Sequence, residues 1–279
     1  MPSRLPTLTF KGLRALAAAG MLLAGFAPTA HAAGQVNTTF AIYMRGLHVL
    51  DADASYQIEP WGYGGTTHIR PAGLISWFVT MDIHSRVEGD FVPGGNVKPI
   101  RYDSGGLSRG QHRRVLLTYN GNTPHVDILE PAETDRDPIP DSDLPHTIDT
   151  LSGMARLLET LTQTKSCEGS GVIFDGLRLT KMTVHGPITS DIPPSHKQAY
   201  SGPALRCDFV GQQIAGFVKD SPNRSKMAAP QPGSAWFKEI DGVGLVPVRI
   251  EFNHPKLGHV TVVMQQPLPP SKSTAILSQ

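Results

Sequence analysis

The chain has 279 residues, of which 25 are Lys or Arg and 24 are Asp or Glu, so its formal net charge is +1 at pH 7. This near-neutral balance, without a basic stripe interleaved with aromatic residues, argues against a nucleic-acid-binding protein. The length is enough to bury the core of one all-β domain or of two small domains.

Residues 1–32 have the pattern of a secretory signal peptide. Arg4, Lys11 and Arg14 accompany an apolar run, which ends in the small-residue sequence Ala30-His31-Ala32. We expect cleavage near Ala32 and a periplasmic protein, whose formal charge changes from +1 to −2 when the three basic residues are removed. The apolar run is shorter than the ~20 residues of a membrane-spanning helix, so we expect no stable membrane insertion after cleavage.

Residues 33–266 predict a single β-rich domain, and residues 267–279 predict a flexible C-terminal tail. Alternating apolar residues over 39–44 and 47–56 predict two strands joined at Arg45-Gly46, and residues 61–69 predict a third. Asn120-Gly121 lies between two apolar runs and predicts a hairpin. Further strands are expected over 115–119, 125–129, 171–185, 204–217, 235–240, 246–252 and 259–265.

Helix is scarce in this pattern. Residues 149–162 predict a helix with Asp149 as its N-cap, because apolar residues recur every three or four positions and give it one apolar face. The segment 72–82, AGLISWFVTMD, is the most apolar stretch of the exported chain and fits either a short helix or a buried strand. The proline-rich, acidic segment 130–147 predicts a long loop without secondary structure. The fold class is therefore mainly β: a large curved antiparallel sheet, open or half-barrel, packed on one or two short helices.

Cys167 and Cys207 are the two cysteines of the chain. In an exported protein they predict one disulfide, and closing a loop of about 41 residues is worth on the order of 4 kcal/mol. Glu168 beside Cys167 disfavours a catalytic thiolate, and neither cysteine has further ligands at metal-site spacing. The Phe174-Asp175-Gly176 step is interpreted as a bulge or bend within a strand.

The sequence contains only weak matches to catalytic and metal-binding motifs. Residues 106–110 fit the G-x-S-x-G pattern of a nucleophile elbow, but that elbow needs a helix after Ser108 and a strand-like sequence follows. Asp82 and His84 share a strand face, but two ligands leave a metal site incomplete, so no metal is predicted. The chain has neither a phosphate-binding loop nor a dinucleotide-binding fingerprint, so no cofactor is expected.

The function favoured by these patterns is non-enzymatic: binding or carrying an apolar or envelope-derived ligand in the concave face of the sheet. Apolar periodicity also fits residues that simply pack together. Two other functions stay open: an envelope assembly or structural factor that binds an unidentified protein, and a hydrolase using Ser108 or a histidine–aspartate pair. The predicted ligand-binding residues are Trp77, Phe78, Met81, Leu151, Met154 and Leu158.

Several segments resemble one known family when taken together and in order. They are FAIYMRGLHVLDADASYQIE, GLISWFVTMDIHSRVEGDFVPGGNVKPIRYDSG, CEGSGVIFDGLRLTKMTV, LRCDFVGQQIAGF, VPVRIEF and LGHVTVVMQQ. They resemble the bacterial exported proteins of domain-of-unknown-function family 3108, in its alphaproteobacterial form, over nearly all of residues 37–266. The resemblance implies one exported β-rich domain, by analogy a curved sheet around a helix as in lipoprotein carriers, and it supplies no activity or catalytic residues. Leu177 stands where arginine is usual in the family.

Overall fold

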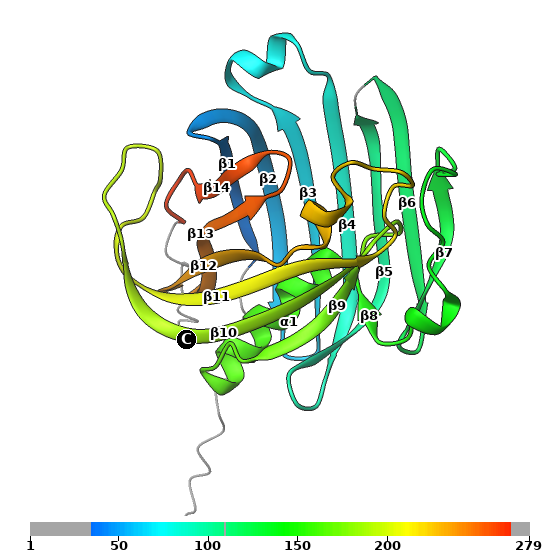
Figure 1. Cartoon of the computed structure of the whole chain (residues 1–279). Coiled ribbons are helices and arrows are strands. Elements are labelled where there is room, and N and C mark those ends of the chain that lie inside the picture. The colour runs from blue at the N-terminus through cyan, green and yellow to red at the C-terminus, as the bar shows by residue number, and fades with distance from the viewer. Residues whose placement is uncertain (1–34, 109, 269–279) are drawn as a thin grey trace, which may run out of the picture. The chain divides into compact units, whose positions relative to one another are not determined.

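The computed structural model describes residues 35–108 and 110–268, so the predicted signal peptide and all but the first two residues of the predicted tail lie outside it. Within these residues fourteen strands form one sheet in the order β7-β6-β5-β4-β3-β2-β1-β14-β13-β12-β11-β10-β9-β8 (Figure 1). The predicted fold class is confirmed. The strands are β1 Val36–Met44, β2 Leu47–Glu59, β3 Gly62–Pro71, β4 Met81–Val92, β5 Asn96–Ser108, β6 Gln111–Asn120, β7 Thr123–Glu130, β8 Thr147–Ile148, β9 Gly169–Phe174, β10 Leu179–Ile192, β11 Gly202–Ala215, β12 Gln231–Ile240, β13 Gly244–His254 and β14 Gly258–Met264.

The sheet consists of two arms joined at one seam. The first arm is β1–β7 and the second is β8–β14, and the seam is the antiparallel pair of β1 with β14. All the strand pairs are antiparallel except β8 with β9. At the far edges, the backbone N–H of His146 donates to the carbonyl of Asn122 at 2.6 Å, so the segment before β8 reaches the turn after β6. The sheet is therefore nearly closed.

The hairpin turns follow local sequence. Arg45 and Gly46 have φ values of 51° and 82°, as a type I′ turn requires, and they join β1 to β2 as predicted. The β6–β7 turn is shifted by one residue from the prediction, because Asn120 pairs with Thr123 and leaves Gly121 and Asn122 as the two loop residues. Gly121 takes the positive φ, 63°, at the first loop position.

The prediction of one strand through Phe174-Asp175-Gly176 is wrong, because the chain turns there between β9 and β10. Phe174 pairs with Leu179 across the turn, and Gly176 has a φ of 87°. One carboxylate oxygen of Asp175 accepts the backbone N–H groups of Leu177 and Arg178 at 3.0 and 2.8 Å. The aspartate therefore closes a hairpin, which is the ordinary use of Asp in turns.

Helix α1, Thr150–Thr164, lies in the bend of the sheet, as Figure 1 shows. Its N-cap is Asp149, whose side chain accepts the N–H of Ser152, as predicted. Ala155 packs with Val87 of the first arm, while Leu161 packs with Phe237 of the second. The apolar face of α1 thus contacts both arms. The other helical segments are the α-helix α2, Arg224–Ala228, and the 3₁₀ helices η1, Gly73–Trp77, and η2, Asp141–Asp143.

The segment before β4 is exposed. Residues 73–77 form η1. Trp77 is its last residue and Phe78 follows it, and these two residues are 79% and 82% exposed. A buried strand over 72–82 is therefore not present, and the 3₁₀ turn projects these aromatic rings away from the core. The acidic loop over 130–147 also differs from the prediction, since it contains η2 and the start of β8.

The disulfide between Cys167 and Cys207 is present, with their Cα atoms 6.0 Å apart. Cys167 precedes β9, and its N–H donates to the carbonyl of Gly186 in β10 at 2.8 Å. Cys207 lies in β11, one strand further on. The bond therefore crosses β10 and ties the end of α1 to the second arm.

Candidate functional site

Two apolar pockets flank helix α1, with volumes of about 420 and 260 Å³. We call them the larger and the smaller pocket. Met154 of α1 and Ile250 of β13 line both, so the pockets adjoin around these two side chains. The apolar lining of the larger pocket includes Leu157, Ile173, Met182, Val184, Phe209 and Phe252. That of the smaller pocket includes Phe40, Tyr56, Ile58, Ile69, Val87, Leu151 and Leu158.

The sheet supplies these walls through strand alternation. In β4, Ser85 and Val87 are buried, whereas His84 and Arg86, which alternate with them, are exposed. Successive side chains of a strand point to opposite faces, so the face that carries Val87 turns toward α1. The opposite face of the same strands is polar.

A few polar groups share the larger pocket. Asp175 and Arg178 come from the β9–β10 turn, and the guanidinium Nε of Arg178 donates to the Asp175 carboxylate at 2.8 Å. His254 ends β13, and burial, together with the positive charges of Arg178 and Lys256, lowers its pKa. The pocket thus combines apolar walls with an arginine and a histidine, an arrangement that suits a ligand with an apolar body and a polar group.

A buried polar network anchors the start of α1. Asp149 is fully buried, and its carboxylate accepts the Ser152 N–H at 2.9 Å, the Ser152 hydroxyl at 2.6 Å and the Tyr119 hydroxyl at 3.2 Å. The Tyr63 hydroxyl donates to the Ser152 oxygen at 2.7 Å. The network links α1 to β3 and β6, and burial raises the pKa of Asp149. Each polar atom has a partner within the protein, so the network has a structural role.

Asp149→Asn is expected to flatten the pH dependence of stability. Because burial raises the Asp149 pKa above its unfolded value, the protonated carboxyl stabilises the fold below about pH 4. This contribution is lost as the pH rises through the folded-state pKa. Urea unfolding at a series of pH values should therefore show the wild type losing stability relative to the variant as the pH rises above about pH 4.

The matched control for this experiment is Asp143→Asn, which alters an exposed carboxylate in η2. It should keep the pH dependence of the wild type. A constant difference in unfolding free energy between the wild type and Asp149→Asn across the series would contradict the prediction.

The predicted ligand-binding residues divide into two groups in the structure. Leu151, Met154 and Leu158 line the smaller pocket beside α1. The structure places Trp77 and Phe78 on the exposed η1 segment and Met81 at the start of β4, opposite Ser108, and these three line neither pocket. One site formed by all six residues is therefore not present, because the turns of η1 direct the aromatic side chains into solvent.

The strand residues that line the pockets, such as Phe209 and Ile250, were not predicted from the sequence. Both lie in alternating apolar patterns, which indicate a buried face. The pattern does not indicate which of several buried positions faces a hollow. That information depends on how the two arms meet around α1.

The G-x-S-x-G segment has the geometry of a hairpin. Ser108 ends β5 and pairs with Gln111, the first residue of β6. A nucleophile elbow needs a helix after the serine, and here a strand follows. Among the described residues, the Ser108 hydroxyl has no hydrogen bond to a histidine, so the structure offers no support for the hydrolase alternative.

In the part of the chain that the structure describes, no helix has the length and hydropathy needed to cross a membrane. The family model of the protein of unknown function DUF3108 matches residues 39–265, and this agrees with the resemblance inferred from the sequence. The chain has no significant match among curated proteins.

Two solved structures resemble the chain. One is a β-barrel-like protein of domain of unknown function DUF1849 from Brucella abortus, with 11% identity, a TM-score of 0.41 and coverage of 83% of this chain and 97% of that one. The other is named as an exported protein with a YmcC-like fold from Bacteroides fragilis, with 11% identity, a TM-score of 0.32 and coverage of 82% and 93%.

Proposed function

Because the chain belongs to the DUF3108 family of proteins of unknown function, we propose its role from its own site: a non-enzymatic periplasmic protein that binds an apolar ligand beside α1. The observation that carries this proposal is the pair of adjoining apolar pockets. Protein cores leave few voids larger than a water molecule, whereas small-molecule sites occupy roughly 300–1,000 Å³. The larger pocket, at about 420 Å³, falls in the second class.

The ligand class follows from the lining. Met154 and Ile250 join the two pockets, so an elongated apolar body such as an acyl chain fits better than a compact one. Arg178 and His254 supply the polar contacts in the larger pocket. An acyl chain with a polar head group satisfies both features, because Asp175 lines the same pocket and already pairs with Arg178, and the periplasm is a source of such molecules.

The direct test is the mass of the protein purified from the periplasm without denaturation. Native mass spectrometry should show the processed chain, lacking residues 1–32, with an added apolar molecule that organic solvent extracts. A processed chain of bare mass that also fails to bind an added fatty acid would refute the proposal. An unprocessed chain recovered from the cytoplasm would refute the location.

Met154→Trp is expected to weaken binding of the fluorescent fatty acid cis-parinaric acid by about tenfold or more. The larger side chain fills space in both pockets, and a steric cost of about 1.4 kcal/mol corresponds to a tenfold loss of affinity. Fluorescence titration of the wild type and the variant measures the change.

Leu257→Trp is the control, since Leu257 is exposed in the turn between β13 and β14. It adds the same indole outside the pockets and should leave the affinity unchanged. Equal affinities of the wild type and Met154→Trp would place the ligand elsewhere.

A second candidate function is binding of an envelope protein, and the η1 segment favours it. Leu74, Trp77 and Phe78 are 73%, 79% and 82% exposed within one short segment, and exposed clusters of large apolar residues often mark interaction surfaces. If this function holds, a partner captured in stoichiometric amount by the wild type should be lost with the Trp77→Ser, Phe78→Ser double variant. Retention of the partner by that variant would exclude η1 as the surface.

A further inference from the structure

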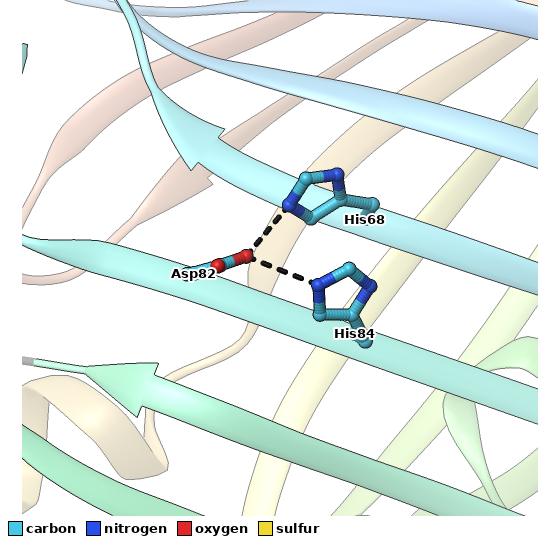
Figure 2. A group of neighbouring side chains, drawn as sticks. All are labelled: His68, Asp82 and His84. Atoms are coloured by element: carbon cyan, nitrogen blue, oxygen red, sulfur yellow. Dashed lines mark hydrogen bonds and ion pairs between the residues drawn. The ribbon is translucent and has the colours of Figure 1, made fainter.

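His68, Asp82 and His84 meet on the polar face of the first arm. His68 of β3 is the direct antiparallel partner of His84 in β4. Asp82 lies two residues before His84, so strand alternation places it on the same face. Figure 2 shows the three side chains converging from the two strands.

The contacts within this His-Asp-His cluster are close. The Asp82 Oδ1 atom lies 2.6 Å from the Nε2 of His68 and 3.1 Å from the Nε2 of His84 (Figure 2). The two imidazole rings stack with their centroids 4.0 Å apart and an interplanar angle of 8°. Each residue therefore directs one ligand atom toward a common point, and these atoms lie within 4.8 Å of one another.

His68 is the third ligand of this arrangement. Asp82 and His84 alone, the pair recognised in the sequence, leave a metal site incomplete. Ligand atoms at about 2.1 Å from a metal ion lie no more than about 4.2 Å apart, so small side-chain rotations bring all three to one ion. Two imidazole nitrogens with one carboxylate oxygen suit the borderline divalent ions of the first transition row. Mg²⁺ and Ca²⁺ prefer sites made of oxygen atoms.

The carboxylate of Asp53 lies beside His68, on the side of the ring that faces away from Asp82. The Oδ2 atom of Asp53 in β2 lies 3.9 Å from the Nδ1 of His68. Asp53 is itself held by Arg70 and by the Thr39 hydroxyl, which donates to it at 2.8 Å. Metal-binding histidines commonly direct their second ring nitrogen to a carboxylate, which fixes the ring orientation. At 3.9 Å this Asp53 oxygen is beyond hydrogen-bond distance from His68, so a small rotation of the ring or the carboxylate is needed for Asp53 to take this role.

The cluster is accessible to a metal ion. The side chains of His68, Asp82 and His84 are 34%, 58% and 65% exposed. His68 and His84 also line an open groove of about 1220 Å³ on this face. An ion bound by these three residues has open coordination positions, which water or a second ligand in the groove can occupy.

We propose that His68 Nε2, Asp82 Oδ1 and His84 Nε2 bind one divalent transition-metal ion of the Zn²⁺ class, with Asp53 orienting His68. The site lies on the opposite face of the sheet from the pockets beside α1 and does not depend on the function proposed for them. A purely hydrogen-bonded surface cluster is the competing explanation, and the variants below distinguish the two.

Isothermal titration of the untagged full chain with Zn²⁺ is the test. The wild type should bind one ion, and His84→Ala should bind it at least about 10- to 100-fold more weakly, the loss typical even of outer-sphere partners. Asp82→Asn keeps an oxygen that accepts hydrogen bonds but removes the anionic ligand, so it should also lose affinity. Asp53→Asn should weaken binding by about tenfold.

His125→Ala is the control, because His125 is exposed on β7 outside the cluster. It should bind Zn²⁺ as the wild type does. Absorption bands of the protein titrated with Co²⁺ should change between the wild type and His84→Ala and stay the same for His125→Ala. Failure of the wild type to bind, or equal affinity of the wild type, His84→Ala and Asp82→Asn for Zn²⁺, would overturn the proposal.

Discussion

Replacing Cys167 and Cys207 with alanine is expected to lower the free energy of unfolding by about 4 kcal/mol. The two residues are 40 positions apart in sequence, so the disulfide removes substantial entropy from the unfolded chain. Domains of this kind are stable by only about 5–15 kcal/mol, and the change is therefore a large share of the total. Both sulfur atoms lie in the cluster between α1 and the second arm, where alanine avoids burying a new polar group.

Urea unfolding under oxidising conditions measures this loss. The wild type treated with a reductant is the control, and it should unfold at nearly the same urea concentration as the double variant. If the variant unfolds with the free energy of the oxidised wild type, the disulfide contributes nothing to stability.

Phe237→Ala is expected to lower the free energy of unfolding by about 3–5 kcal/mol, the range for a large-to-small change at a buried aromatic residue. Phe237 of β12 is fully buried. It packs in the cluster that contains Leu158 and Leu161 of α1 and the disulfide. The cavity left by its ring cannot collapse easily, because α1 and the cross-linked strands surround it.

Phe78→Ala is the matched control, since the same side chain is 82% exposed there. Its effect should stay within about 0.5 kcal/mol. Chemical denaturation of both variants makes the comparison. Similar losses at the two positions would contradict the burial pattern and, with it, the placement of α1 against the second arm.

Most of the strands and α1 were predictable because their signals are local, whereas β4, β5 and the short β8 were not among the predicted strands. Alternating residues define the strands, the Arg45-Gly46 pair defines a turn, and the spacing of apolar residues with Asp149 at the start defines the helix. The errors also have local causes. Trp77 and Phe78 were expected to bind a ligand because they lie in the most apolar stretch of the exported chain, and the apolar sequence does not record the direction in which a 3₁₀ turn points its side chains.

The sites were less predictable, because they depend on contacts between distant parts of the chain. The helix side of the pockets follows from the spacing of Leu151, Met154 and Leu158. The opposite wall, with Ile250, depends on the β1–β14 seam that brings the second arm around α1. His68 joins Asp82 through the β3–β4 register, which the sequence does not specify.

The strand order of the sheet has a consequence for folding. Apart from the β1–β14 seam, every pair joins strands that are consecutive in sequence, and the parallel β8–β9 pair differs only in having α1 as its connection. Most pairings therefore close short loops, which cost little chain entropy, and the contact order is low for an all-β protein. Each arm can grow hairpin by hairpin without the other. The seam joins strands from opposite ends of the domain, so its closure carries the largest entropic cost and is expected to limit the folding rate.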